Sequence, residues 1–266
     1  MNLTQCSLNR EEAKLLKEHF RYDPTGNIHE NSTPAAALSN RIELAMMLEK
    51  IGKKLNSPSP LVTASQFSKR YSFMVAVPAL YAMAVFDKGM NATLGNCRIG
   101  PSAAPDVWMP HLQLDDDECL PAPLHDRHSW RDTIFKRLFK ENLSIVNRML
   151  TALTSVPETI LWENTALYVF WLFEERMKQS DTPQAEQIKE DFHHLVFADE
   201  GEVFGKSANP LQPFYSRKHL NGVRVRQTCC LYYKLPEADF CSTCRKCWRN
   251  EPEDEVSPAA SLHAKR

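Results

Sequence analysis

Five cysteines crowd into nineteen positions near the C-terminal end of the sequence, between Cys229 and Cys247. The chain has eight cysteines, and the other three, Cys6, Cys97 and Cys119, are scattered. Disulfides are rare in the cytosol, so clustered cysteines in a cytosolic chain indicate a metal site. The crowded residues are Cys229, Cys230, Cys241, Cys244 and Cys247, and the first four have the spacing CC-x10-C-x2-C.

Four thiolates can bind either a tetrahedral Zn²⁺ ion or an iron–sulfur cluster, because both prefer soft sulfur donors. A zinc ribbon usually has two C-x2-C knuckles, whereas among these four only Cys241 and Cys244 form one. Adjacent residues of an extended strand point to opposite faces, so Cys229 and Cys230 converge on one ion only with a local bend. The spacing favours the cluster and leaves zinc open, together with a thiol–disulfide pair or buried thiols.

The motif and its surroundings resemble the FhuF-like ferric siderophore reductases, in which a CC-x10-C-x2-C run binds a [2Fe–2S] cluster. The likeness covers roughly residues 158–247 and includes VRVRQTCCLYYKLP, ANPL and LWENTALYVFW. Cys247 forms a second C-x2-C with Cys244, so the spacing alone leaves a ligand set with Cys247 open. The ligands that the resemblance implies are Cys229, Cys230, Cys241 and Cys244.

The resemblance also implies a one-electron reaction on a ferric siderophore, of hydroxamate or hydroxamate–citrate type. Fe³⁺ suits anionic oxygen donors much better than Fe²⁺ does, so reduction weakens the chelate and releases Fe²⁺. We therefore expect no catalytic residue beyond the cluster. The sequence has no convincing G-x-G-x-x-G dinucleotide-binding unit, so we expect electrons from a separate ferredoxin, flavodoxin or flavoprotein reductase.

Basic residues gather around the cysteines, since residues 217–249 contain eight Lys or Arg against two Asp or Glu, a surplus of +6. Arg224 and Arg226 lie two apart on an expected strand and so share a face. We expect Arg224, Arg226 or Lys234 to contact the chelate. Two alternatives stay open: the charges compensate the thiolates, or the arginines orient the cysteine loop.

Amphipathic spacing predicts the elements that position this motif. Helices are expected over Asn40–Leu55, Arg131–Leu153, Glu163–Gln179 and Pro183–Phe197. The apolar run Ser72–Phe86 is shorter than the roughly twenty residues of a membrane-spanning helix and reads as a buried segment. Gly95–Leu124 reads as a long connection with short strands, and Asn221-Gly222 predicts a hairpin within Arg217–Leu235.

These elements predict an α+β fold, mainly α-helical, with a small antiparallel β element near the cysteines. We expect an N-terminal helical region over residues 1–124 that contributes substrate specificity. A reductase region follows over 125–247 with the cluster segment at 217–247, and residues 248–266 are polar and read as a disordered tail.

The remaining features exclude or weaken other functions. The net charge of −1 argues against nucleic-acid binding. The first residues do not form a secretory signal, so we expect a cytoplasmic protein without an integral membrane segment, and leave peripheral association open. A zinc-stabilised binding module is the alternative function. We interpret the aromatic side chains of residues 162–173 as core, and His125, His128 and the acidic run 115–118 as solvated. His193 and His194 are adjacent and so are poorly placed to share one ion on a helix.

Overall fold

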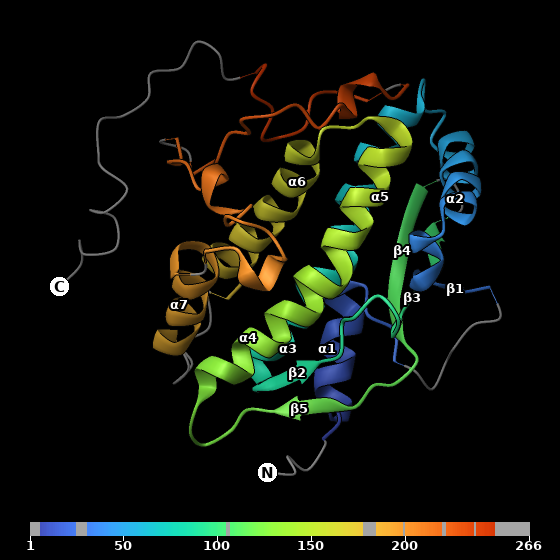
Figure 1. The fold of residues 1–266 in the computed structure, drawn as a ribbon. Coiled ribbons are helices and arrows are strands. Elements are labelled where there is room, and N and C mark those ends of the chain that lie inside the picture. The colour runs from blue at the N-terminus through green and yellow to red at the C-terminus, as the bar shows by residue number, and fades with distance from the viewer. Residues whose placement is uncertain are drawn as a thin grey trace.

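The computed structural model describes residues 6–24, 31–104, 107–177, 185–198, 200–219, 222–236 and 238–247. The chain folds as helices around one long central helix, with two small antiparallel sheets at one side (Figure 1). The predicted tail, residues 248–266, lies outside the described residues.

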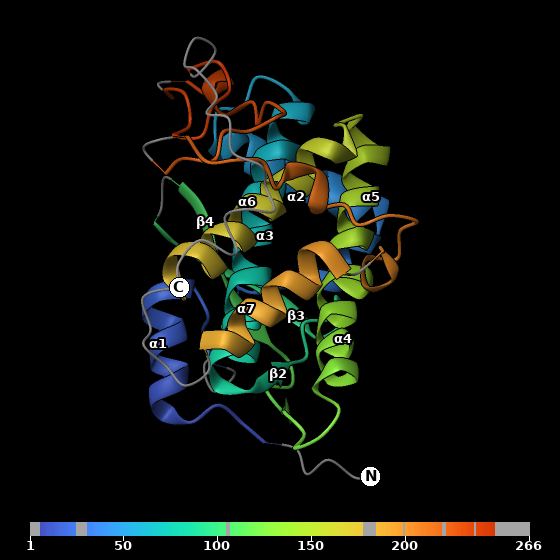
Figure 2. The ribbon, with the colours of Figure 1, turned by 90° about the vertical axis from the view of Figure 1, so that its left-hand side faces the viewer.

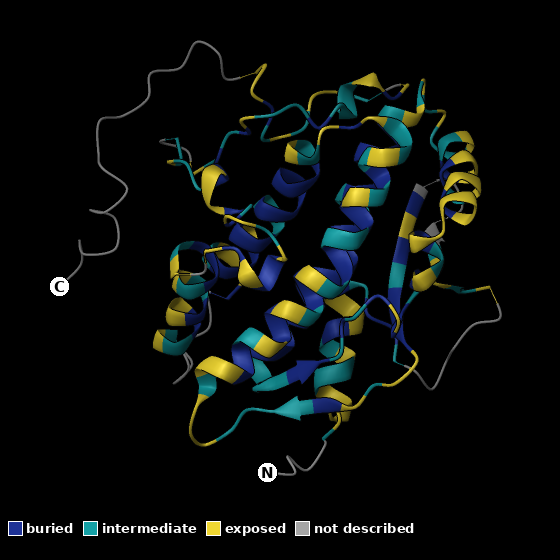
Figure 3. Ribbon diagram, viewed as in Figure 1, coloured by how far each residue is buried: buried dark blue, intermediate teal, exposed yellow. Residues whose placement is uncertain are grey.

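The central helix is α3, Pro60–Phe86, which has 27 residues and is buried along most of its length (Figure 3). Apolar and small residues occupy all of its faces, which is typical of a helix surrounded by others. Ser59 caps its first turn by accepting a hydrogen bond from the amide of Val62, and Pro60 occupies the first position. The run Ser72–Phe86 is thus part of a buried helix, and within the described residues no helix is long and apolar enough to cross a membrane.

In the described part of the chain, six helices pack against α3. The four predicted helical ranges fall on α2, on α4 with α5, on α6 and on α7, although the ends of two ranges, at Gln179 and Pro183, lie outside the described residues. Asn40 caps α2, because its side chain accepts hydrogen bonds from the amides of Ile42 and Glu43. The six are α1 (Arg10–Phe20), α2 (Arg41–Lys54), α4 (Arg127–Leu138), α5 (Ser144–Thr154), α6 (Glu158–Trp171) and α7 (Ala185–His193).

Short π-helical segments interrupt or extend three of these helices. Segment η3 (Phe139–Leu143) joins α4 to α5, η4 (Leu172–Arg176) follows α6, and η5 (His194–Ala198) follows α7. A π turn inserts a residue and rotates the side chains that follow it, and such turns are frequent at functional sites. The 3-10 segments are η2 (Ala35–Ser39), η6 (Glu202–Phe204), η7 (Gln212–Phe214) and η8 (Tyr232–Lys234).

Two small sheets lie between residues 33 and 121, and both are antiparallel. The region Gly95–Leu124 forms longer strands than we expected, because β3 and β4 have eight residues each. The register between these two strands shifts after Ile99, next to Pro101. A proline cannot donate a hydrogen bond to the neighbouring strand, and it interrupts the alternation of apolar and polar residues by which a strand is recognised in a sequence. The sheets are β1 (Thr33–Pro34), β3 (Cys97–Ala104) and β4 (Val107–Leu114), and β2 (Lys88–Met90) with β5 (Cys119–Pro121).

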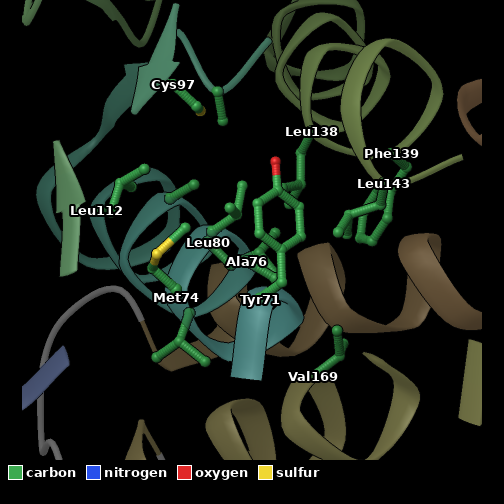
Figure 4. Packing of buried hydrophobic residues seen from close by; sticks show 14 of the residues in the cluster. Tyr71, Met74, Ala76, Leu80, Cys97, Leu112, Leu138, Phe139, Leu143 and Val169 are labelled. Atoms are coloured by element: carbon green, nitrogen blue, oxygen red, sulfur yellow. The ribbon is translucent and has the colours of Figure 1, made fainter. Parts of the chain in front are cut away.

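One hydrophobic core cluster draws on the chain from Leu16 to Phe214. Figure 4 shows side chains of α3 at its centre, among residues of β4, α4, η3 and α6. Tyr71 is fully buried there and donates its hydroxyl to Asn142 Oδ1 at 2.8 Å. The core therefore joins residues on both sides of Leu124, while the division of the chain into functional regions there stays a prediction.

The fold class is confirmed as mainly α-helical with small antiparallel sheets. The sheets, however, come from residues 33–121 and not from the cysteine region. In the part of the chain that the structure describes, the hairpin predicted within Arg217–Leu235 is one antiparallel bridge, between Lys218 and Arg224. Gly222 has φ 81°, as a tight turn requires, and Asn221 lies outside the described residues.

Candidate metal centre

The segment with the clustered cysteines, residues 226–247 and called the cysteine segment here, lies over one end of α3 and α6 (Figure 2). Two buried side chains of α3 hold it there. Ser65 Oγ and Gln66 Nε2 both donate to the carbonyl oxygen of Cys230, at 2.8 and 2.7 Å. Asn164 of α6 donates to the carbonyl of Ser65 at 3.1 Å, so the backbone of Cys230 is fixed against both helices.

A buried carboxylate of α6 fixes the chain just before the first cysteine pair. Glu163, 1% exposed, accepts hydrogen bonds from the amides of Gln227 and Thr228 at 2.5 and 2.9 Å, and from the Thr228 hydroxyl. It also forms an ion pair with Arg226 at 3.2 Å, while Arg226 donates to Asn164 Oδ1 at 2.7 Å. These bonds satisfy a buried charge and set the direction in which the chain enters the cysteine pair.

Backbone contacts bring the two halves of the motif together. The amide of Arg226 donates to the carbonyl of Thr243 at 2.9 Å, and the Arg245 guanidinium donates to the carbonyl of Gln227. The amide of Cys244 donates to the carbonyl of Cys241 at 2.9 Å, which closes the C-x2-C turn. The two cysteine pairs, which ten residues separate in the sequence, therefore meet across the segment.

Four of the five clustered cysteines are buried or half-buried, as expected for ligands of a metal ion or an iron–sulfur cluster. Cys230 and Cys244 are buried, Cys229 and Cys241 are half-buried, and Cys247 is exposed. The Sγ atoms of Cys230 and Cys241 lie 3.5 Å apart. This donor set, in a segment held to the core, fits a group bound by soft sulfur ligands.

Positive charge beside the thiols also fits such a group. The pKa of Cys230 is lowered to about 5, first by the hydrogen bond from the Cys241 thiol and then by the charge of Arg226, a backbone amide and the charge of Lys69. The pKa of Cys241 is raised, because its thiol donates to Cys230 and is partly buried. Among the described residues, Arg226 Nε is buried without a hydrogen-bond partner, so one donor remains next to the thiols. A thiolate is the form that binds metal.

The three predicted substrate contacts lie in different surroundings. Arg224, 7% exposed, pairs with Glu174 of η4 at 2.6 Å, and its guanidinium lies 4.2 Å from the ring centre of Tyr215. Arg226 is 4% exposed and faces α6, whereas Lys234, on η8, is exposed. Both arginines are turned toward the protein, Arg224 toward η4 and Arg226 toward α6. This burial favours the structural alternative for Arg224.

A pocket of about 350 Å³ opens beside Cys241. Its wall combines two cationic side chains, Lys69 and Arg226, with aromatic side chains of α3 and α6. The charge of Lys69 acts on the thiols of Cys230 and Cys241. The lining residues are Lys69, Phe73, Asn164, Leu167, Tyr168, Trp171, Arg226, Cys241, Ser242 and Thr243.

The residues of α3 and α6 that support the cysteine segment were not predicted from the sequence. A signal for Glu163 and Asn164 was present, since both interrupt the apolar run LWENTALYVFW. The aromatic residues of that helix were expected in the core, and Trp162, Phe170 and Phe173 are buried there, but the prediction was wrong for Trp171, which is exposed. Lys69, Ser65 and Gln66 had no such signal, because nothing local distinguishes them from other polar residues of α3.

Two family models match this chain. The first, described as ferric iron reductase FhuF-like transporter, matches residues 65–224, which is 160 of the 266 residues. The second, the FhuF 2Fe-2S C-terminal domain, matches residues 226–244 and so contains Cys229, Cys230, Cys241 and Cys244 but not Cys247. No curated protein matches the chain.

The family match begins at residue 65, well before residue 158, where the resemblance in the sequence began. It includes the part of α3 that contacts the cysteine segment, and it ends next to the match to the [2Fe–2S] domain. The residues of α3 and α6 that hold the cysteine segment, and that segment as far as Cys244, thus fall within matched regions. The chain belongs to the FhuF-like ferric iron reductase family and has the family's [2Fe–2S] C-terminal domain.

Proposed function

We propose that this protein is a cytoplasmic ferric siderophore reductase, acting on chelates of hydroxamate or hydroxamate–citrate type. Cys229, Cys230, Cys241 and Cys244 hold the [2Fe–2S] cluster in this proposal. The cluster, when bound, supplies one electron at a time. The observation that carries the proposal is the pocket beside Cys241, because it joins a cluster ligand to a surface that can receive a chelate.

The lining of the pocket suits an amphipathic, anionic ligand. Phe73, Tyr168 and Trp171 offer apolar ring faces, while Lys69 and Arg226 contribute positive charge. Hydroxamate chelates present aliphatic arms around an oxygen shell, and citrate-type chelates add carboxylates. The volume of about 350 Å³ is at the lower end of ligand pockets, which span about 300–1,000 Å³, so the pocket receives one edge of a chelate.

The reaction requires no acid–base residue at the substrate. Ferric iron accepts one electron, and the resulting Fe²⁺ is held weakly by the hard oxygen donors, so it leaves to an Fe²⁺ acceptor. Lys69 and Arg226 contribute in binding, since their charge attracts an anionic chelate and is screened little in a partly buried pocket. The electron comes from a separate ferredoxin, flavodoxin or flavoprotein reductase.

Stopped-flow mixing tests the proposal. The protein with its cluster is reduced anaerobically and mixed with a ferric trihydroxamate, a ferric hydroxamate–citrate chelate or a ferric tricatecholate, with a chromogenic Fe²⁺ trap present. We expect rapid, saturable reoxidation with hydroxamate-type chelates and one Fe²⁺ trapped for each electron. Reoxidation that is linear in chelate concentration and equal for all three chelates would contradict a substrate site.

A further inference from the structure

Three side chains that can bind a metal meet where α4 passes the end of α7, in a cluster that the cysteine segment does not share (Figures 1 and 2). His128 and Asp132 lie four residues apart on α4, and His194 is the first residue of η5. Asp132 Oδ1 lies 2.8 Å from His194 Nε2, and its Oδ2 lies 3.2 Å from His128 Nδ1. One potential ligand atom from each residue lies within 4.8 Å of the other two.

Contacts besides those among the three residues hold α4 against α7 and η5 in this position. Asp191 of α7 is fully buried and accepts hydrogen bonds from Arg127 at 2.8 Å and from Arg131 at 3.1 Å, both on α4. The ring of Phe135 stacks on that of His194, with centres 6.4 Å apart. The two elements that supply the three residues are therefore held together before any ligand binds, which reduces the entropy lost on binding.

Of the two adjacent histidines, only His194, at the start of the π turn, belongs to the three-residue cluster. His193 is exposed, and its ring centre lies 5.3 Å from that of Phe197. His194, one residue later, has a side chain only 12% exposed and faces α4. His125, which the sequence pairs with His128, is exposed and lies before the start of α4.

The geometry points to a binding site for one divalent transition-metal ion of the Zn²⁺ and Fe²⁺ class, held by His128, Asp132 and His194. Two imidazole nitrogens and a carboxylate are ligands that these ions accept, with water in the remaining positions. Bonds of about 2.0–2.2 Å to the ion place ligand atoms about 3.3 Å apart in a tetrahedral site. The His128 side chain, 62% exposed, is free to rotate and bring its nitrogen into that range. The ion would link α4 to η5.

A competition titration tests this site on the protein with its cluster, with Zn²⁺ as the probe and a chromophoric chelator as the competitor. The variants are His128→Ala, Asp132→Asn and His194→Ala, and the matched controls are His125→Ala and His193→Ala. We expect one Zn²⁺ ion bound by the wild type and by both controls, and a loss of affinity of more than about tenfold in each of the three variants. Equal affinity in wild type, His128→Ala and His194→Ala would overturn the inference, as would no binding by the wild type.

A second measurement resolves the individual residues and does not depend on variants that fold. Diethylpyrocarbonate modifies exposed histidines, and mass spectrometry of peptides quantifies each of them. We expect Zn²⁺ to slow modification of His128 and His194 but not of His125 and His193. Equal modification rates with and without Zn²⁺ at His128 and His194 would count against the site, whatever the reductase activity of the protein.

Discussion

The carboxylate of Glu163, in α6, accepts a hydrogen bond from the backbone amide of Thr228 at 2.9 Å, directly before the first cysteine of the pair. The same buried carboxylate pairs with Arg226, which is itself buried. A helix of the core thus fixes both the backbone and the charge next to the cysteine segment. The cysteine segment is therefore held closely against the helices, and we expect its stability and its iron content to depend on α6.

Replacement of Glu163 by alanine tests this dependence. The change leaves Arg226 as a buried charge without its carboxylate, which typically costs about 3–5 kcal/mol in the free energy of unfolding. We expect that loss in chemical denaturation, together with a lower iron content of the purified protein. Glu175→Ala is the control, because Glu175 is 54% exposed and its pair with Lys218 is worth about 0–1 kcal/mol. Equal effects of the two changes would argue against a supporting role for Glu163.

The proposed ligand set predicts different iron contents for single Cys→Ser variants. Replacing Cys229, Cys230, Cys241 or Cys244 should remove most of the bound iron and the visible absorption of the cluster. Cys247→Ser is the control and should keep both, because Cys247 is exposed and lies outside the match to the [2Fe–2S] domain. Iron and sulfide analysis with EPR of the reduced protein measures the outcome. If Cys247→Ser lost the cluster and any one of the other four variants kept it, the proposed ligand set would be wrong and Cys247 would be a ligand.

The positive charge of Lys69 predicts a dependence of affinity on the charge of the chelate. Lys69→Gln should raise KM for an anionic ferric hydroxamate–citrate by roughly fivefold, which corresponds to about 1 kcal/mol of screened attraction in a partly exposed pocket. KM for an uncharged ferric trihydroxamate should change little. Lys50→Gln, on the exposed side of α2, is the control. A rise in KM that is the same for both chelates would show that Lys69 does not act by its charge.

Arg224 and Lys234, both predicted to contact the chelate, should behave differently on replacement. Lys234 is exposed, so Lys234→Ala should keep the stability of the protein and raise KM if the predicted contact exists. Arg224→Ala should lower the free energy of unfolding by about 2–3 kcal/mol, less than a fully orphaned buried charge costs, because Lys218 still pairs with Glu174. Denaturation and Michaelis constants for several siderophores separate the two roles. Unchanged KM values in both variants would leave Arg226 as the remaining predicted contact.

The sequence by itself determined the chemistry of the centre and most of the helices. The spacing CC-x10-C-x2-C is local, and it led to the family and to the [2Fe–2S] domain that the family model matches. The helical period is local as well, so α2 and α7 fell within predicted ranges, whereas α6 begins at Glu158, before the predicted start at Glu163. The strands of Gly95–Leu124 were harder to recognise, because Pro101 and Pro110 interrupt their alternation.

Only the tertiary structure decided which side chains surround the centre. Lys69 lies beside Cys241 and Glu163 beside Thr228 because α3 and α6 pack together under the cysteine segment. Arg224 and Arg226 read as a basic surface in the sequence but are buried, since their partners on η4 and α6 lie 50 and 62 positions away in the sequence. The periodicity of a helix or strand can be read from residues that are close in the sequence. Whether a charged side chain is buried, and which residue it pairs with, depends on which elements pack against its own element.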